Sequence, residues 1–212
     1  MLATKVAGLL LVYLLLFASF SLRADDLALE PTPDPRWYAL PPPDKTDWSN
    51  KRLNKYAAVE WGKLGEPLAV IRVPDLAVAA PIYSDTHVEA LEAGAAWVTL
   101  TAAPGEAGNI AVAGHRDSFF RPLEDIPVGT QISLTTADQE QLFAVTSVEI
   151  VDPLDTSPLN PTETTTLTLI TCHPFRYLGF APNRYIIRAE LLEVSETPVD
   201  LAESTMRITT AN

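Results

Sequence analysis

The chain has 212 residues, of which 47% are hydrophobic, and a formal net charge of −12 from 27 acidic and 15 basic side chains. This length suffices for one domain with a buried core plus appendages. The acidic balance argues against nucleic-acid binding, which needs a clustered basic surface, and against attraction of the domain to an anionic membrane surface. A single cysteine cannot form an internal disulfide, so cysteine content does not identify the redox compartment.

Residues 1–23 predict a membrane anchor or signal segment. Residues 6–22 form an uncharged, mostly apolar run with Lys5 before it and Arg23 after it. The run is at the short end of the roughly 17 to 25 residues that span a bilayer, and it is long for the roughly 7 to 15 of a signal-peptide core. We favour an uncleaved single-pass anchor in the cell membrane, with the rest of the chain on the extracytoplasmic side. A cleaved signal peptide is the alternative.

Two segments follow the anchor before the main domain begins. Residues 24–46 are rich in proline and acidic residues, which predicts a stiff extended linker that holds the domain away from the membrane. Residues 47–66 predict a helical lead-in that Asp47 or Ser49 can cap and that Gly65 ends. We expect the Trp61 side of this helix to pack on the domain, with a solvated linker helix as the alternative.

Residues 67–194 predict an all-β domain. Short runs of strand-forming residues alternate with turn signals that contain proline, glycine, asparagine or aspartate. The strand candidates are residues 68–73, 108–113, 131–135, 141–151, 165–171 and 184–193. So many short strands favour a closed or nearly closed barrel, because closure removes exposed strand edges.

One short helix is expected inside the domain and a loose tail after it. Residues 85–94 begin with Asp85 or Thr86 as a cap and end at Gly94, which is typical of a short helix. Residues 195–212 are polar and predict a tail without a packed core.

The only cysteine, Cys172, lies at the end of an apolar strand candidate. Strand alternation puts Leu167, Leu169 and Thr171 on one face, and Thr168, Ile170 and Cys172 on the other. The two leucines mark the first face as core, so Thr171 is expected to have a structural role. The thiol then ends the opposite face, next to a turn, where it could attack a substrate. A buried, inert cysteine is the alternative.

Two residues could assist such a nucleophile. His115 follows the strand candidate 108–113 and shares a face with small alanines, which leave room beside it; Gly114 permits close backbone approach or a bulge. Arg184 opens the last strand candidate, and because arginine keeps its proton it can stabilise negative charge but cannot act as a base. Considered singly, either residue would more often be a solvated surface residue.

Three other residues compete for these roles. Arg188 shares a strand face with Arg184. His173 is adjacent to Cys172, but neighbouring side chains on a strand point to opposite sides. His87 lies in the predicted short helix and is interpreted as a surface residue.

Three motifs in chain order resemble the signatures of the sortases, which are membrane-anchored cysteine transpeptidases. These motifs are AGHRD at 113–117, TLITC at 168–172, and Arg184. The similarity extends from about residue 68 to residue 192, and the sequence after Cys172 is most like the class D sortases. The resemblance implies an eight-stranded sortase-type β-barrel with short helices, preceded by an N-terminal transmembrane helix.

The resemblance also implies a reaction. The Cys172 thiolate would attack an LPxTG-like sorting motif in a secreted protein and form a thioester, which an amine of the cell envelope or of a protein lysine would resolve. His115 would act as general acid and base, and Arg184 would stabilise the oxyanion. Thr168, Ile170 and Ala113 would line the peptide groove. The alternatives are an endopeptidase of the same fold that only hydrolyses its substrate, and a non-catalytic anchored β-domain that binds a partner.

No cofactor and no metal site are predicted. Calcium is the alternative, because four carboxylates lie near predicted loops: Glu124, Asp125, Asp152 and Asp155. In an acidic protein such scattered acids are usually solvated surface residues.

Overall fold

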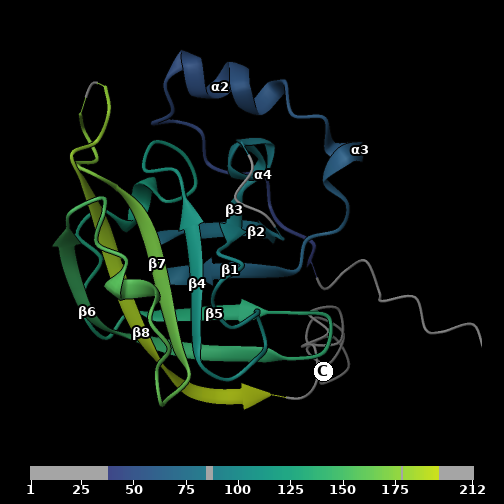
Figure 1. Ribbon diagram of the computed structural model, residues 1–212. Helices are drawn as coiled ribbons and strands as arrows, with labels where there is room; N and C mark the ends of the chain where they lie inside the picture. Colours follow the sequence, from purple (N-terminus) through teal and green to yellow (C-terminus); the bar gives the residue numbers. More distant parts are fainter. Residues whose placement is uncertain (1–37, 85–87, 178, 196–212) are drawn as a thin grey trace, which may run out of the picture. The chain divides into compact units, whose positions relative to one another are not determined.

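The computed structural model describes residues 38–84, 88–177 and 179–195 (Figure 1). The predicted anchor at 1–23, most of the predicted linker and the tail after Ser195 lie outside these ranges. Residues 85–87, which include the predicted helix cap and His87, lie outside them too. Within the described part of the chain, no helix combines the length and apolar character that crossing a bilayer requires.

Eight strands in the described ranges form a closed barrel (Figure 1). They are β1 (Ala69–Val73), β2 (Val78–Tyr83), β3 (Ala95–Trp97), β4 (Asn109–Gly114), β5 (Gln131–Thr135), β6 (Glu140–Val151), β7 (Thr166–His173) and β8 (Asn183–Ser195). Their order around the barrel is β1-β2-β3-β4-β7-β8-β6-β5, and β5 pairs with β1 to close it. The β2–β3 and β4–β7 pairs are parallel. The expected all-β, eight-stranded barrel is confirmed.

The sequence pattern did not predict two of these strands, β2 and β3. Strand β2 contains Pro81 and two alanines, which are poor strand formers, and β3 is only 3 residues long. Strand β2 pairs with β1 along five positions, and these backbone hydrogen bonds stabilise it despite its weak intrinsic preference for strand structure. Strand β6 has register shifts against β8 at Leu142/Phe143 and Val145/Ser147, which are typical of β-bulges.

The helices are short and lie outside the barrel. They are α2 (Asn50–Ala57), α3 (Trp61–Leu64) and α4 (Val88–Ala93), with 3-10 turns at Pro74–Leu76, Arg121–Leu123 and Ser157–Leu159. The lead-in is therefore two helices and not one. Ser49 caps α2 by accepting a hydrogen bond from the Arg52 amide at 3.2 Å, and Gly65 ends α3 with a φ of 69°.

The aromatic packing of the lead-in differs from expectation. Trp61 is 47% exposed and contacts Tyr56 edge-on, whereas Leu53 and Tyr56 pack against the barrel core. The expected packing of this side of the lead-in therefore holds for these two residues but not for Trp61 itself. The buried aromatic is Trp48, 7% exposed, whose ring centroid lies 5.2 Å from that of Phe119. Because Phe119 follows β4 closely, this contact fixes the lead-in beside the end of that strand.

The last part of the predicted linker contacts the domain. Arg72 on β1 donates a hydrogen bond to the Ala39 carbonyl at 3.3 Å. The prolines at 41–43 line an open pocket together with Tyr56 and Trp61. The end of the predicted linker therefore packs against the domain that it precedes.

The hydrophobic core fills the barrel. Its large, fully buried side chains include Ile71, Ile82, Ile110, Ile132, Leu134, Phe143, Leu167, Leu169 and Ile187. Leu167 and Leu169 thus occupy the inner face of β7, as alternation predicted. Thr168, Ile170 and Cys172 consequently lie on its outer face.

The close packing of Gly114 against Phe120 predicts that a side chain at position 114 would destabilise the fold. A Cβ added there would lie 2.6 Å from Cδ2 and 2.7 Å from Cγ of Phe120, whose side chain is fully buried at 0% exposure. Because the ring cannot move outward, we expect Gly114→Ala to lower the free energy of unfolding by about 1–3 kcal/mol. Urea denaturation measures this. Gly62→Ala is the matched control, since a Cβ at Gly62 meets nothing within 4 Å; equal stability of the two variants would contradict the prediction.

Candidate active site

The parallel pairing of β4 with β7 brings His115 level with Cys172. The paired positions run from Asn109↔Thr166 to Ala113↔Ile170. Strand β4 ends at Gly114; continuing this register two positions beyond Ala113 and Ile170 leads to His115, the first residue after β4, and to Cys172 on β7. The two strand ends are tied there, because the buried hydroxyl of Thr171 donates a hydrogen bond of 2.7 Å to the Gly114 carbonyl. Thr171 therefore has the structural role that its face predicted.

Arg184 lies directly opposite Cys172 on the antiparallel neighbour β8. Side chains at directly paired antiparallel positions lie on the same face, with Cβ atoms about 4.5–5.5 Å apart. Arg188, the rival on this face, pairs with Thr168 and forms an ion pair with Glu149 at 3.4 Å. Arg184 is therefore the arginine next to the thiol.

His173 belongs to a different environment. Its ring stacks on Tyr185 with centroids 5.9 Å apart and an interplanar angle of 15°, and it meets Phe175 edge-on at 6.4 Å. Tyr185 is part of the barrel core. His173 therefore faces the inner side, away from Cys172, in agreement with strand alternation.

Charged residues from the short helices surround His115. Its Nε2 lies 3.6 Å from Oε1 of Glu92 on α4. Glu92 is 4% exposed and forms ion pairs with Arg52 and, at 2.7 Å, with Lys55, both on α2. Arg52 also pairs with Asp117 at 2.8 Å. The helical lead-in thus contributes to the surroundings of the histidine.

Burial and charge together set the protonation of these groups. Burial, and then the positive charge of Arg52, hold the pKa of His115 below its usual value, although Glu92 and Asp117 partly oppose this. Burial alone would raise the pKa of Glu92, but hydrogen bonds from Lys55 and Arg52 outweigh it and hold that pKa below the usual range. His115 is therefore neutral near pH 7, whereas Glu92 is ionised.

Sequence reasoning did not identify Arg52 or Glu92. They come from helices 40 positions apart, and neither lies near a recognisable motif. One signal was available: Arg52 lies between Trp48 and Tyr56 at helical spacing, on the stripe that packs on the barrel. A charged residue in such a stripe indicates a buried partner.

The three expected groove residues have different environments. Ala113 and Ile170 are register partners on the outer faces of β4 and β7, and both keep part of their surface exposed. Thr168 is 0% exposed, and its hydroxyl donates a hydrogen bond of 2.7 Å to Oδ1 of Asn109. Thr168 therefore supports the groove from beneath but offers no surface to a substrate in this structure. The expectation that it lines the groove is corrected accordingly.

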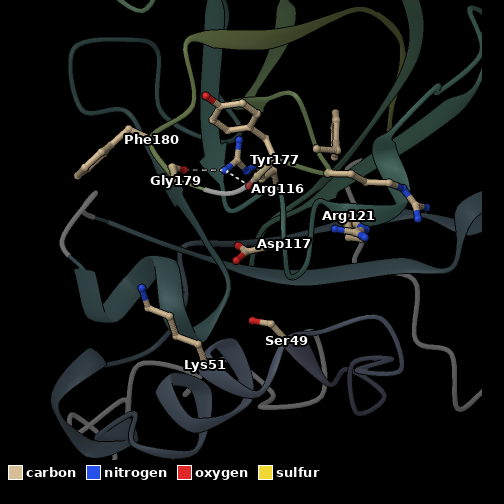
Figure 2. Close-up of a pocket in the computed structure, with 10 residues that line it drawn as sticks. Ser49, Lys51, Arg116, Asp117, Arg121, Tyr177, Gly179 and Phe180 are labelled. Atoms are coloured by element: carbon tan, nitrogen blue, oxygen red, sulfur yellow. Dashed lines mark hydrogen bonds between the residues drawn. The ribbon is translucent and has the colours of Figure 1, made fainter.

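Arg116, the residue after His115, holds the loop that follows Cys172. Its guanidinium donates hydrogen bonds to the carbonyl oxygens of Tyr177 and Gly179 at 3.0 and 3.1 Å (Figure 2). It also donates one to the Pro174 carbonyl at 2.7 Å. It also lies 5.9 Å from the Tyr177 ring centroid. An open pocket of about 610 Å³ lies between this loop, Asp117 and the start of α2. Phe180 projects from the loop fully exposed.

Three of the four carboxylates considered for calcium have other local partners. Glu124 pairs with Arg176 at 3.3 Å, whereas Asp152 and Asp155 accept backbone hydrogen bonds within their own turns. In the described part of the chain, no three His, Cys, Asp or Glu side chains gather closely enough to hold a metal ion.

The arrangement provides the groups that acyl transfer needs. A thiol, an imidazole and a guanidinium lie at neighbouring strand ends, where β4 and β7 end and β8 begins. A thiolate can attack a carbonyl, an imidazole can move protons, and a guanidinium can stabilise developing negative charge.

Known proteins with similar sequences share this region. Sortase D of Bacillus subtilis (strain 168) is 35% identical over 124 residues, which cover 58% of this chain and 63% of that protein. The match thus spans less than two thirds of Sortase D. The putative sortase YwpE of the same organism is 36% identical over 90 residues, 41% of this chain and 85% of that protein. The match to Sortase D agrees with the expected class D likeness.

Solved structures share the fold. A sortase D5 transpeptidase of Clostridium perfringens superposes with a TM-score of 0.55 at 26% identity, covering 70% of this chain and 92% of that chain. Sortase E of Streptomyces avermitilis superposes with a TM-score of 0.52 at 28% identity, covering 62% of this chain and 91% of that chain.

A family model described as the Sortase domain matches residues 71–192, which is more than half of the chain. This range contains His115, Cys172 and Arg184, and it runs from β1 into β8. The chain therefore belongs to the sortase family.

Proposed function

We propose that this protein is a cysteine transpeptidase that cleaves an LPxTG-like sorting motif in secreted proteins and transfers the acyl group to an amine. The observation that carries the proposal is the strand register, which sets His115 level with Cys172 and Arg184 opposite it. Membership of the sortase family supports the same reaction class.

Acylation is the first half of the proposed reaction. Neutral His115 first takes the proton of the Cys172 thiol, which leaves a thiolate and an imidazolium. The thiolate attacks the scissile carbonyl carbon, a C–S bond forms, and the carbonyl oxygen becomes an oxyanion that Arg184 stabilises. As the oxyanion collapses, the C–N bond breaks and the leaving amine takes a proton from the His115 imidazolium. The products are a thioester and a free amine.

Deacylation reverses these roles. An incoming amine attacks the thioester carbon and gives a proton to neutral His115, after which the C–S bond breaks and the Cys172 thiolate is regenerated. If water attacks in place of the amine, the result is hydrolysis. The low pKa of His115 favours its neutral, proton-accepting form near pH 7.

The peptide would lie along the outer faces of β4 and β7. Ala113 and Ile170 are the residues we propose to contact it, because they are adjacent, partly exposed and two positions before His115 and Cys172. The small Ala113 side chain leaves room for a substrate residue between the strand and the histidine.

We place the enzyme at the cell membrane through residues 1–23, with the barrel on the extracytoplasmic side. The uncharged apolar run at 6–22 supports this placement. The proposed acceptor is an amine of the cell envelope or of a protein lysine, and secreted proteins with a C-terminal sorting motif are the proposed substrates.

A ligation assay tests the proposed reaction. Full-length protein in detergent is mixed with sorting-motif peptides and an amine acceptor, and ligated and hydrolysed products are separated by chromatography and mass spectrometry. We expect Cys172→Ala to abolish both products, His115→Ala to reduce turnover about 100- to 10,000-fold, and Arg184→Ala to reduce it about 100- to 1000-fold.

The matched control is Arg188→Ala, on the same strand face but paired with Glu149. It should stay within about twofold of wild type, because a partly exposed ion pair contributes little. Activity that survives Cys172→Ala would contradict the proposal that Cys172 is the nucleophile. Hydrolysis alone at every acceptor concentration would refute transpeptidation and leave an endopeptidase.

The protonation of His115 gives a second prediction. Because its pKa is lowered from 6.5 by burial and then by Arg52, the unfolded chain takes up this proton first as the pH falls. The free energy of unfolding should therefore decrease as the pH drops below about 6.5 towards the folded-state pKa. NMR titration, with His115→Gln to assign the signal, should give a midpoint below 6.5. A midpoint at or above that value would contradict the prediction.

A further inference from the structure

Glu92 is a buried carboxylate that faces the nitrogen of His115 remote from the groove. It lies on α4 and is 4% exposed, and its Oε1 is 3.6 Å from Nε2 of His115. The same oxygen accepts a hydrogen bond of 2.7 Å from Lys55, and the other oxygen is bonded to Arg52. A carboxylate so deeply buried requires partners, and the imidazole is the one neighbour not yet hydrogen-bonded to it.

Nε2 of His115 is itself a buried polar atom in need of a partner. It has no hydrogen-bond partner among the residues that the structure describes. The separation of 3.6 Å from Glu92 exceeds a normal N–H···O distance of about 2.7–3.2 Å. A small rotation of the ring would close this gap and satisfy both atoms. With Nε2 directed at Glu92, Nδ1 is the nitrogen left to exchange protons near Cys172.

The other charges around His115 fix Glu92 in place. From α2, Arg52 and Lys55 bind the carboxylate, and Arg52 also binds Asp117 in the turn after β4. Arg184 lies on β8, opposite Cys172. Because two cations bind Glu92, the carboxylate remains ionised and cannot turn away without losing both ion pairs.

We propose that Glu92 is a positioning residue that orients His115 for proton transfer. Its carboxylate accepts a hydrogen bond from Nε2–H, which holds the ring with Nδ1 towards Cys172 and stabilises the imidazolium. The moving proton passes between Nδ1 and the substrate amine. The Nε2 proton stays on the ring, Glu92 stays ionised, and no bond to Glu92 forms or breaks. The catalytic step rests on the proposed function, whereas the orientation of the ring does not.

The helical lead-in thereby becomes part of the site. Arg52 and Lys55 set the position of Glu92, and the contact of Trp48 with Phe119 fixes α2 beside the turn that carries Asp117. The competing interpretation is an ion-pair network that only joins α2 to α4. The two interpretations differ in what happens to the protonation of His115 when Glu92 is neutralised.

Wild-type protein provides a test that needs no variant. In ¹⁵N NMR spectra of the full-length protein above the His115 titration midpoint, neutral His115 should carry its proton on Nε2. The Nδ1–H tautomer would overturn the proposal, because Nε2 could not then donate to Glu92.

Glu92→Gln provides the second test, with the exposed Glu89→Gln on the same helix as the matched control. Loss of the carboxylate removes an interaction that favours the imidazolium, so the His115 titration midpoint should fall. Ligation should lose about 10- to 100-fold in kcat with KM little changed, as is typical for partners that orient a functional histidine. Glu92→Asp should restore part of kcat, and Glu89→Gln should match wild type.

A structural role alone predicts a different result. In that case Glu92→Gln would lower the melting temperature but leave the His115 midpoint and the kcat of the folded protein unchanged, and the proposal would be wrong. Failure of the proposed function is distinguishable. It would appear as no acylation of Cys172 in the wild type, while the tautomer and the shift in midpoint would still report whether Glu92 orients the ring.

Discussion

The parallel pairing of β4 with β7 is the constraint on which the site depends. It sets His115 level with Cys172, and the Thr171 hydroxyl bonded to the Gly114 carbonyl secures the pairing at its end. A shift of one residue would turn each side chain of one strand to the other face and separate the pair. The inner leucines of β7 oppose such a shift, because it would expose them and bury polar residues. The strand register that core packing holds in place therefore also fixes the positions of the proposed catalytic residues.

Three consecutive residues after Gly114 connect this strand end to three separate parts of the molecule. His115 lies next to Glu92 of α4. Arg116 binds three carbonyls of the loop after β7, and Asp117 binds Arg52 of the lead-in helix. The loop and the lead-in therefore meet the site through one short turn, whose aromatic neighbour Phe119 packs on Trp48. A change in the conformation of the loop after β7 or of the lead-in can therefore alter the position of His115 through a few residue contacts.

Strand alternation explains why much of this could be predicted from the sequence. It correctly assigned the inner leucines, the structural Thr171 and the outward Cys172, because the pleat fixes side-chain direction locally. It failed for Thr168, since burial of an outer-face residue depends on what covers it. Asn109, which holds the Thr168 hydroxyl, is itself bonded to the carbonyls of Pro158 and Asn160 in a distant turn. Arg52 and Glu92 were missed for the same reason, because their pairing exists only once the helices have packed.

The most direct test of the central claim is mass spectrometry of full-length protein after incubation with a library of sorting-motif peptides and no amine acceptor. The account predicts an acyl group attached through a thioester to the proteolytic fragment that contains Cys172, and its release when an amine is added. An acyl group on any other residue would contradict the account. So would the absence of an adduct with every peptide while the Cys172 thiol of the folded protein still reacts with an alkylating reagent.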